Sequence, residues 1–336
     1  MSNAGRLSWR IATPHTVSAA IACIELTGDE HSLAACLDVL GVGVKPPGSL
    51  WLCNFAGIDE GVVARLSPVC IHLMPHGGLF VVRAIASVLE KHFPGCAGPP
   101  AGEEARLRAY PEARDVHEAR MLDALASASS PRAVSLLLDQ PGRWRKHDAG
   151  ELEGPDAGIT GQLNRLLRPP TVVALGASNI GKSTLVNALA RRSVSIVADE
   201  PGTTRDHVGV NLDVDGLTIR FIDTPGVRED APNVERRAWT LTQKILRHAD
   251  LVLLCGDAWN APLDLERVGV HTPHPSPSTL TLLLRADIGT AIGWSPEVET
   301  SAARGQGINE LAVAIRRRLV TDEALADGRP WHFWPD

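Results

Sequence analysis

The chain has 336 residues, of which 44% are hydrophobic, and its formal net charge at pH 7 is −6. This length and composition predict a globular protein of about two or three domains with ample apolar core. They argue against a membrane protein, because no stretch approaches the roughly 20 apolar residues of a membrane span, and against a generally basic DNA or RNA binder. The N-terminus lacks an apolar signal core and the six cysteines form no CxxC pair, so we expect a cytoplasmic location.

Residues 1–95 are predicted to form a small α+β domain. Apolar runs predict strands at 10–13, 19–26 and 69–73, and a hairpin of two strands at 50–55 and 61–66. Helices are predicted at 30–40, with Asp29 as its N-cap and Gly41 as its stop, and at 79–92. His72 and His76 lie near the turn Gly77–Gly78, where a ligand site and a purely structural role both remain open.

Residues 96–168 are predicted to be a helical connector. A Pro/Gly cluster at 94–102 marks its beginning, and the composition of 103–129 favours helix. Pro131 can open a further helix through 133–138, with Ser130 as its cap. The basic and aromatic cluster at 143–146 is either a solvated face or an RNA contact.

The stretch 176–183, GASNIGKS, predicts a phosphate-binding loop at the start of a domain at 169–320. It follows the apolar run 172–175 and leads into a helical pattern, so backbone N–H groups and a helix N-terminus converge on phosphate. Lys182 is expected to reach the β- and γ-phosphates and the Ser183 hydroxyl to bind Mg²⁺. We expect nucleotide contacts from the whole loop, namely Gly176, Ser178, Asn179, Ile180, Gly181, Lys182, Ser183 and Thr184.

Two downstream loops indicate a GTPase. In the first, 201–206, Thr204 is the best candidate for a Mg²⁺ ligand that responds to the γ-phosphate, with Thr203 next. Alternating strands at 208–214 and 217–221, joined by the turn Asp215–Gly216, then deliver the second loop, 223–226. There Asp223 is expected to hold Mg²⁺ through water, and the Gly226 N–H to bond the γ-phosphate.

The base-binding side follows two buried apolar runs at 251–254 and 280–284. GTPases usually carry Asn-Lys-x-Asp after the second run, and here Asp287 keeps the guanine-binding carboxylate. Leu284 cannot make the asparagine contact and Arg285 replaces the stacking lysine, so weaker guanine affinity is an open alternative. Ser301 and Ala302 fit the last base-side loop, and a closing helix at 309–319 ends in the basic run 316–318, before a tail at 321–336.

Taken together, these motifs resemble the MnmE family of tRNA modification GTPases, also called TrmE. The matching residues are 176–189, 202–206, and 223–228 followed by Glu235. The segments 11–14, 76–78 and 123–138 resemble, more weakly, the start and glycine turn of the family's folate-binding domain and the first part of its helical domain.

The resemblance implies roles for particular residues. Asn179 would bind a K⁺ ion, which supplies positive charge near the β- and γ-phosphates. Glu235 would orient the attacking water, although a solvated position on a helical turn is the alternative for this residue. The resemblance also implies pairing of two GTPase domains, a flavoprotein partner, tRNA as substrate and a tetrahydrofolate derivative as cofactor.

The sequence departs from the family in two places. The connector before the GTPase domain is short, and the stretch after Pro94 does not match the family's Arg/Asn/Lys-rich segment near the folate pocket. Nothing in the printed sequence matches the long helical segment and cysteine motif that follow the GTPase domain, and the last cysteine is Cys255. We therefore expect a truncated or divergent member in which folate use and uridine modification are in question. Two hypotheses follow: a Mg²⁺-dependent, K⁺-stimulated GTPase linked to modification of the tRNA wobble uridine, or a GTP-dependent conformational switch without that activity.

Overall fold

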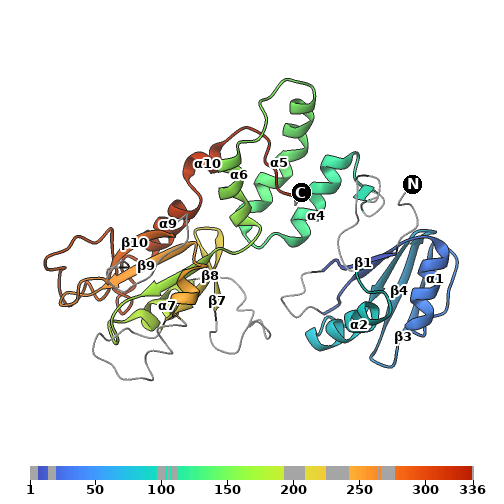
Figure 1. Ribbon diagram of the computed structural model, residues 1–336, viewed down its shortest axis with the longest axis horizontal. Coiled ribbons are helices and arrows are strands. Elements are labelled where there is room, and N and C mark those ends of the chain that lie inside the picture. The colour runs from blue at the N-terminus through green and yellow to red at the C-terminus, as the bar shows by residue number, and fades with distance from the viewer. Residues whose placement is uncertain are drawn as a thin grey trace. The chain divides into compact units, whose positions relative to one another are not determined.

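The computed structural model describes residues 7–13, 20–96, 112–192, 209–224, 242–263 and 277–334, together with 103, 106–107, 110 and 265. The chain divides into two compact units, 1–127 and 128–336 (Figure 1). No helix among the described residues is long and apolar enough to cross a membrane. The sequence had placed its breaks at 95, 168 and 320, so the unit boundary falls inside the predicted connector.

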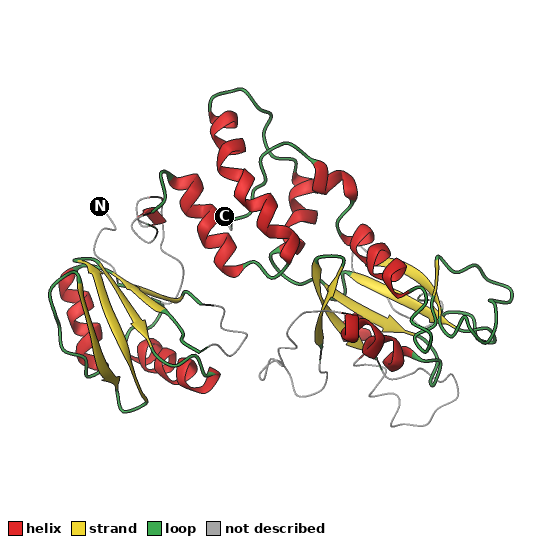
Figure 2. Cartoon of the chain, turned by 180° about the vertical axis from the view of Figure 1, so that it is seen from behind, coloured by secondary structure: helices red, strands yellow, loops and turns green. Residues whose placement is uncertain are grey.

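The N-terminal unit is built on an antiparallel sheet of five strands in the order β1-β2-β5-β4-β3. These strands are β1 (Ser8–Ile11), β2 (Ile24–Thr27), β3 (Ser49–Phe55), β4 (Asp59–Ser67) and β5 (Cys70–Met74). Helices α1 (Glu30–Val39) and α2 (Leu79–His92) share one apolar core with the sheet (Figure 2). The sequence prediction of these elements is confirmed, except that the second strand begins at Ile24 rather than at residue 19.

Local capping explains where α1 begins and where a later helix, α4 (Val116–Ser127), begins. The side chain of Asp29 accepts a hydrogen bond from the Ser32 N–H at 2.7 Å, as expected for the N-cap of α1. The predicted helix at 103–129 is too long, because residues 112–115 are not helical and α4 begins only after Asp115. Asp115 accepts from the Glu118 N–H at 3.0 Å, so a local N-cap sets this start.

The C-terminal unit contains a six-stranded sheet in the order β11-β10-β9-β6-β8-β7. Every neighbouring pair is parallel except β8 with β7, which confirms the mostly parallel sheet. The strands are β6 (Thr171–Leu175), β7 (Val210–Val214), β8 (Leu217–Asp223), β9 (Leu251–Gly256), β10 (Ser278–Leu283) and β11 (Val298–Glu299). Helices α7 (Lys182–Arg192) and α9 (Ile308–Leu319) contact each other and the sheet, and Val173, Leu175, Ile222, Leu246 and Val252 form a buried cluster.

The β7–β8 turn is held by charges from two helices of this unit. Asp215 and Gly216 have positive φ values of 53° and 78°, as the predicted hairpin turn requires. The Asp215 carboxylate accepts from Arg132 of α5 (Pro131–Asp148) and from Arg316 of α9, each at 2.8 Å. Arg316 also bonds Asp322 of α10 (Asp322–Ala326). The basic run at the end of α9 is thus tied into ion pairs rather than left as a free cationic surface.

The predicted tail packs against the helices that precede the sheet. The side chain of Trp331 is 1% exposed, and its indole N–H donates to the Asn164 side chain at 2.9 Å. Asn164 follows α6 (Ala157–Leu163) and is the first residue of the short helix η1 (Asn164–Leu166). Arg143 donates to the Asp327 carbonyl, and the Trp144 indole donates to the Trp331 carbonyl. These contacts give Arg143 and Trp144 a structural role. Helix α5 also runs on through Pro141 to Asp148, well beyond the predicted end at 138.

Candidate nucleotide-binding site

The phosphate loop joins the central strand of the larger sheet to a helix. Strand β6 ends at Leu175, α7 begins at Lys182, and the loop between them lies at the carboxyl edge of the sheet. Because β6 pairs with β8 on one side and β9 on the other, the loop faces the ends of three parallel strands. The N-terminus of α7 adds a partial positive charge there, as an anion site requires.

The two glycines of the loop are required for different reasons. A Cβ on Gly176 would lie 2.5 Å from the Cys255 carbonyl oxygen and 2.7 Å from the Ile180 side chain, so packing excludes any larger residue. Gly181 has room for a side chain but a φ of 108°, which L-residues rarely adopt. Asn179 also lies in the left-handed region, with a φ of 64°, and its side chain is exposed.

The side chain of Lys182, which is expected to bind phosphate, is buried against the phosphate loop. Its ammonium group donates to the carbonyls of Gly176 and Ala177 at 3.1 and 2.8 Å. Burial lowers the pKa of Lys182, and the nearby carboxylate of Asp223 opposes this shift. A bound polyphosphate would supply the negative charge that favours the ammonium form.

Ser183 and Asp223 meet as a metal site requires. The Ser183 hydroxyl donates to Oδ2 of Asp223 at 2.5 Å, although 40 residues separate them in the sequence. The other oxygen, Oδ1 of Asp223, is buried and has no hydrogen-bond partner among the described residues. An unsatisfied carboxylate oxygen beside a hydroxyl fits a Mg²⁺ ion, which prefers such oxygen ligands.

The base-side residues also come together. Ser301 is fully buried, and its hydroxyl donates to Oδ1 of Asp287 at 2.6 Å, a bond that lowers the pKa of this carboxyl. The Ser301 N–H, which was expected to face the base, donates instead to the Gln306 carbonyl at 3.0 Å. Arg285 has a φ of 57°, and its side chain lies beside Gly181, which links the base-side loop to the phosphate loop.

The remaining predicted residues fall into two groups. Ser178, Ile180 and Thr184 lie on the phosphate loop or in the first turn of α7, with Ile180 buried and Thr184 exposed, and Ala302 follows Ser301. Thr203, Thr204, Gly226 and Glu235 lie outside the described residues, so their roles stay predictions. Sequence reasoning missed the contact of Arg285 with the phosphate loop, because nothing local in the sequence signals it.

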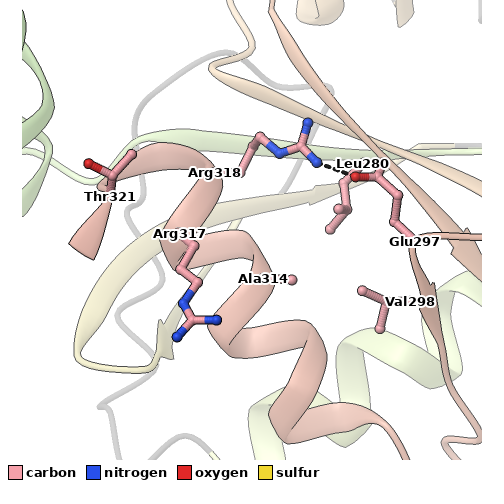
Figure 3. A pocket seen from close by; sticks show the side chains of 7 residues that line it. All are labelled: Leu280, Glu297, Val298, Ala314, Arg317, Arg318 and Thr321. Carbon is pink, nitrogen blue, oxygen red and sulfur yellow. Dashed lines mark hydrogen bonds and ion pairs between the residues drawn. The ribbon is translucent and has the colours of Figure 1, made fainter. Parts of the chain in front are cut away.

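A separate pocket of about 360 Å³ lies where α9 meets β10 and β11 (Figure 3). Its lining includes Arg317, Arg318 and Glu297, and Arg318 is paired with Glu297 across it. No residue of the phosphate loop lines this pocket. It is therefore not the nucleotide site.

Comparisons with known proteins show which families and structures the chain is similar to. Residues 171–281 match the family model described as a 50S ribosome-binding GTPase. A protein of Acidiphilium cryptum named tRNA modification GTPase MnmE is 39% identical over 168 residues, covering 48% of this chain and 35% of that protein. A protein of Methylorubrum populi with the same name is 31% identical, covering 89% of this chain and 77% of that protein. Among solved structures, Era from Aquifex aeolicus is 27% identical, with a TM-score of 0.35 and coverage of 44% of this chain and 56% of that one.

Proposed function

Since the chain belongs to the MnmE family of tRNA modification GTPases, we propose that it hydrolyses GTP with the help of Mg²⁺ and K⁺, and that this reaction serves modification of the tRNA wobble uridine. The observation that carries the proposal is the meeting of Lys182, Ser183 and Asp223 at the carboxyl edge of the sheet. Asp287 with Ser301 supports guanine as the base.

We propose the following roles for the chain's own groups, on these positions and on the resemblance. Loop N–H groups and Lys182 hold the β- and γ-phosphates, while Ser183 and Asp223 are the residues that would hold Mg²⁺. Mg²⁺, when bound, neutralises charge on the phosphate oxygens. The Asn179 side chain is exposed, and we assign its amide oxygen to K⁺ on the resemblance. We assign Glu235 to orienting the attacking water and Thr204 to the Mg²⁺ site, on the resemblance alone.

The partners of this reaction are also proposed from the resemblance to the family. The relatives are named for tRNA modification, and we propose tRNA as the substrate and a flavoprotein as the partner. A second GTPase domain would close over the nucleotide. The N-terminal unit would be the place for a tetrahydrofolate derivative.

Potassium gives the sharpest test of the hydrolytic mechanism. GTP turnover by the full chain is measured in KCl and in NaCl at equal ionic strength, for the unaltered protein and for Asn179→Gly. Glycine is the better replacement, because Asn179 has a positive φ that alanine would strain. We expect turnover to rise in KCl and the variant to lose this rise, by about 100-fold if the ion acts like other electrostatic stabilisers of a transition state.

Two controls separate chemistry from binding. Asn187→Ala, on the exposed part of α7, should keep the response to potassium. GDP binding of Asn179→Gly should stay intact. Equal slow turnover in both salts with normal GTP binding would refute the potassium mechanism. Unchanged wobble-uridine modification in cells that lack the protein would refute the tRNA role while leaving the GTPase chemistry standing.

A further inference from the structure

One face of the N-terminal sheet gathers side chains that commonly bind metals. Strands β2 and β5 are antiparallel, and their register places Glu25 directly opposite His72. Cys70 lies two residues before His72, and Cys23 two residues before Glu25. Because side chains alternate along a strand, Glu25, Cys70 and His72 share the face opposite to the one that packs on α1 and α2. Cys23 lies just before β2 and is a hydrogen-bond partner of His72.

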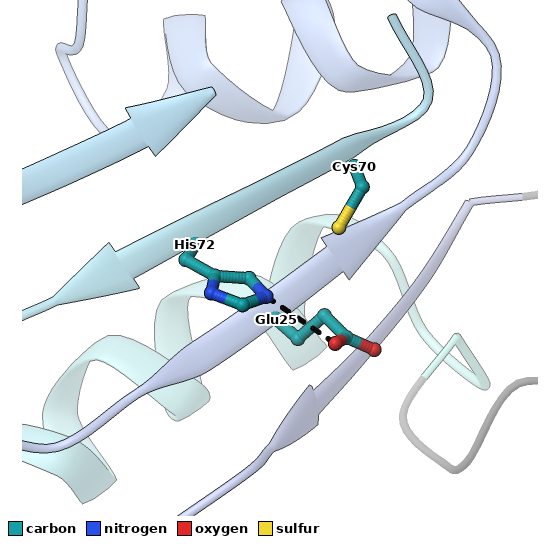
Figure 4. A group of neighbouring side chains, drawn as sticks. All are labelled: Glu25, Cys70 and His72. Atoms are coloured by element: carbon teal, nitrogen blue, oxygen red, sulfur yellow. Dashed lines mark hydrogen bonds and ion pairs between the residues drawn. The ribbon is translucent and has the colours of Figure 1, made fainter. Parts of the chain in front are cut away.

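Three of these groups are close enough to share one ion. Donor atoms of Glu25, Cys70 and His72 all lie within 4.8 Å of one another (Figure 4). Glu25 and Cys70 are buried, at 3% and 4% exposed, and His72 Nε2 lies 3.3 Å from Oε2 of Glu25. A glutamate is almost never buried to this extent unless it is paired.

Charged and polar partners surround the cluster. Arg10 donates to the other oxygen of Glu25, at 3.0 Å, and also pairs with Asp123, while Tyr110 bonds both Arg10 and Asp123. Hydrogen bonds with Cys23, Cys70 and Glu25 raise the pKa of His72 to about 12. The carboxylate of Glu25 thus lies between Arg10 and His72.

We propose that Glu25, Cys70 and His72 form a binding site for a divalent transition metal, with Zn²⁺ as the ion that fits best. Thiolate, imidazole and carboxylate are the donors that Zn²⁺ accepts, whereas Mg²⁺ and Ca²⁺ prefer oxygen alone. Arg10 then holds the carboxylate of Glu25 from its far side, as an outer partner commonly orients a metal ligand. Three ligands leave a fourth position, which the Cys23 thiolate or water would take.

Zn²⁺ binding is expected to depend on pH. A metal site of this kind needs a thiolate and an imidazole nitrogen without a proton, so binding should release protons and become tighter as pH rises. This site contains no residue of the nucleotide site and does not depend on the function proposed above.

The test uses the purified full chain, stripped with EDTA and titrated with Zn²⁺ by calorimetry against a competing chelator. We expect one ion per chain, and a release of protons when the titration is repeated in buffers of different ionisation enthalpy. Co²⁺ in place of Zn²⁺ should give a thiolate-to-cobalt absorption band, and Cys70→Ser should weaken or remove this band. Cys70→Ser and His72→Gln should each weaken Zn²⁺ binding by more than about tenfold.

Two control variants make the same kinds of substitution at a cysteine and a histidine outside the proposed site. Cys36→Ser alters a buried thiol on α1, and His76→Gln alters an imidazole that is paired with Asp59. Both should bind Zn²⁺ like the unaltered chain. Circular dichroism and GDP binding check that the variants are folded, and Cys70→Ala replaces Cys70→Ser if the latter is not. Absence of a cobalt–thiolate band, or equal Zn²⁺ affinity in Cys70→Ser and His72→Gln, would overturn the proposal and leave a buried ion-pair network.

Discussion

The ion pairs of Asp215 provide a quantitative test of how the β7–β8 turn is held. Asp215→Asn keeps the size of the side chain, and asparagine tolerates the positive φ of this position. The change removes the negative charge between Arg132 and Arg316. The Arg316 side chain is only 5% exposed, so it is left with Asp322, a half-exposed partner.

The expected loss follows from these contacts. Hydrogen bonds to charged groups contribute about 1.5 to 3 kcal/mol each. Asp215 is 25% exposed and the asparagine oxygen can still accept one bond, so we expect a loss of about 2 kcal/mol in the free energy of unfolding. For a unit of this length, that corresponds to a fall in Tm of roughly 4 to 8 °C.

Thermal unfolding followed by circular dichroism measures this loss. The relevant transition is the one that added GDP moves upward, because a ligand stabilises only the unit that binds it. Asp139→Asn is the matched control, since Asp139 faces Arg143 at 3.7 Å on the exposed side of α5. Its effect should stay within about 0.5 kcal/mol. If Asp215→Asn lowers Tm no more than Asp139→Asn, the ion pairs do not hold the turn.

Three further predictions rest on other parts of the chain. Gly176→Ala should lower the free energy of unfolding by about 1 to 3 kcal/mol, because the added Cβ would clash with the Cys255 carbonyl oxygen. Gly142→Ala in α5 is the control, because a Cβ there meets open space and should cause no such loss. Equal urea midpoints for the two variants would contradict this prediction. The raised pKa of His72 predicts that its contribution to the stability of the metal-free N-terminal unit is fully present below about pH 6.5 and is lost as pH rises above that value. Urea unfolding in EDTA should show this loss in His76→Gln but not in His72→Gln, and the same pH dependence in both variants would contradict the prediction. Leu284→Asn should tighten GDP binding, measured by calorimetry, and an unchanged affinity would show that the base site is wrongly assigned.

Local signals in the sequence were enough for much of this molecule. The phosphate loop, the Asp215–Gly216 turn and the cap at Asp29 depend on residues within a few positions of one another. Their conformations are set by steric limits on φ and by short-range hydrogen bonds, so residue type alone predicts them. The predicted strands and helices of the N-terminal sheet and the predicted strands β6 to β10 are confirmed, whereas α6, β11 and α10 were not predicted.

Contacts between distant segments were decided only by the tertiary structure. Arg316 is part of a basic run in the sequence, but its partner Asp215 lies about 100 residues away, and only the fold buries the two side chains against each other. The register of β2 and β5 brings Glu25 opposite His72, and no local sequence pattern predicts this pair, because the two residues lie on different strands. Charges and donors were visible in the sequence, but their partners depend on which strands pair and which helix faces pack. Long-range pairing of this kind is a property of the whole fold, because each contact requires chain segments that only the complete core holds together.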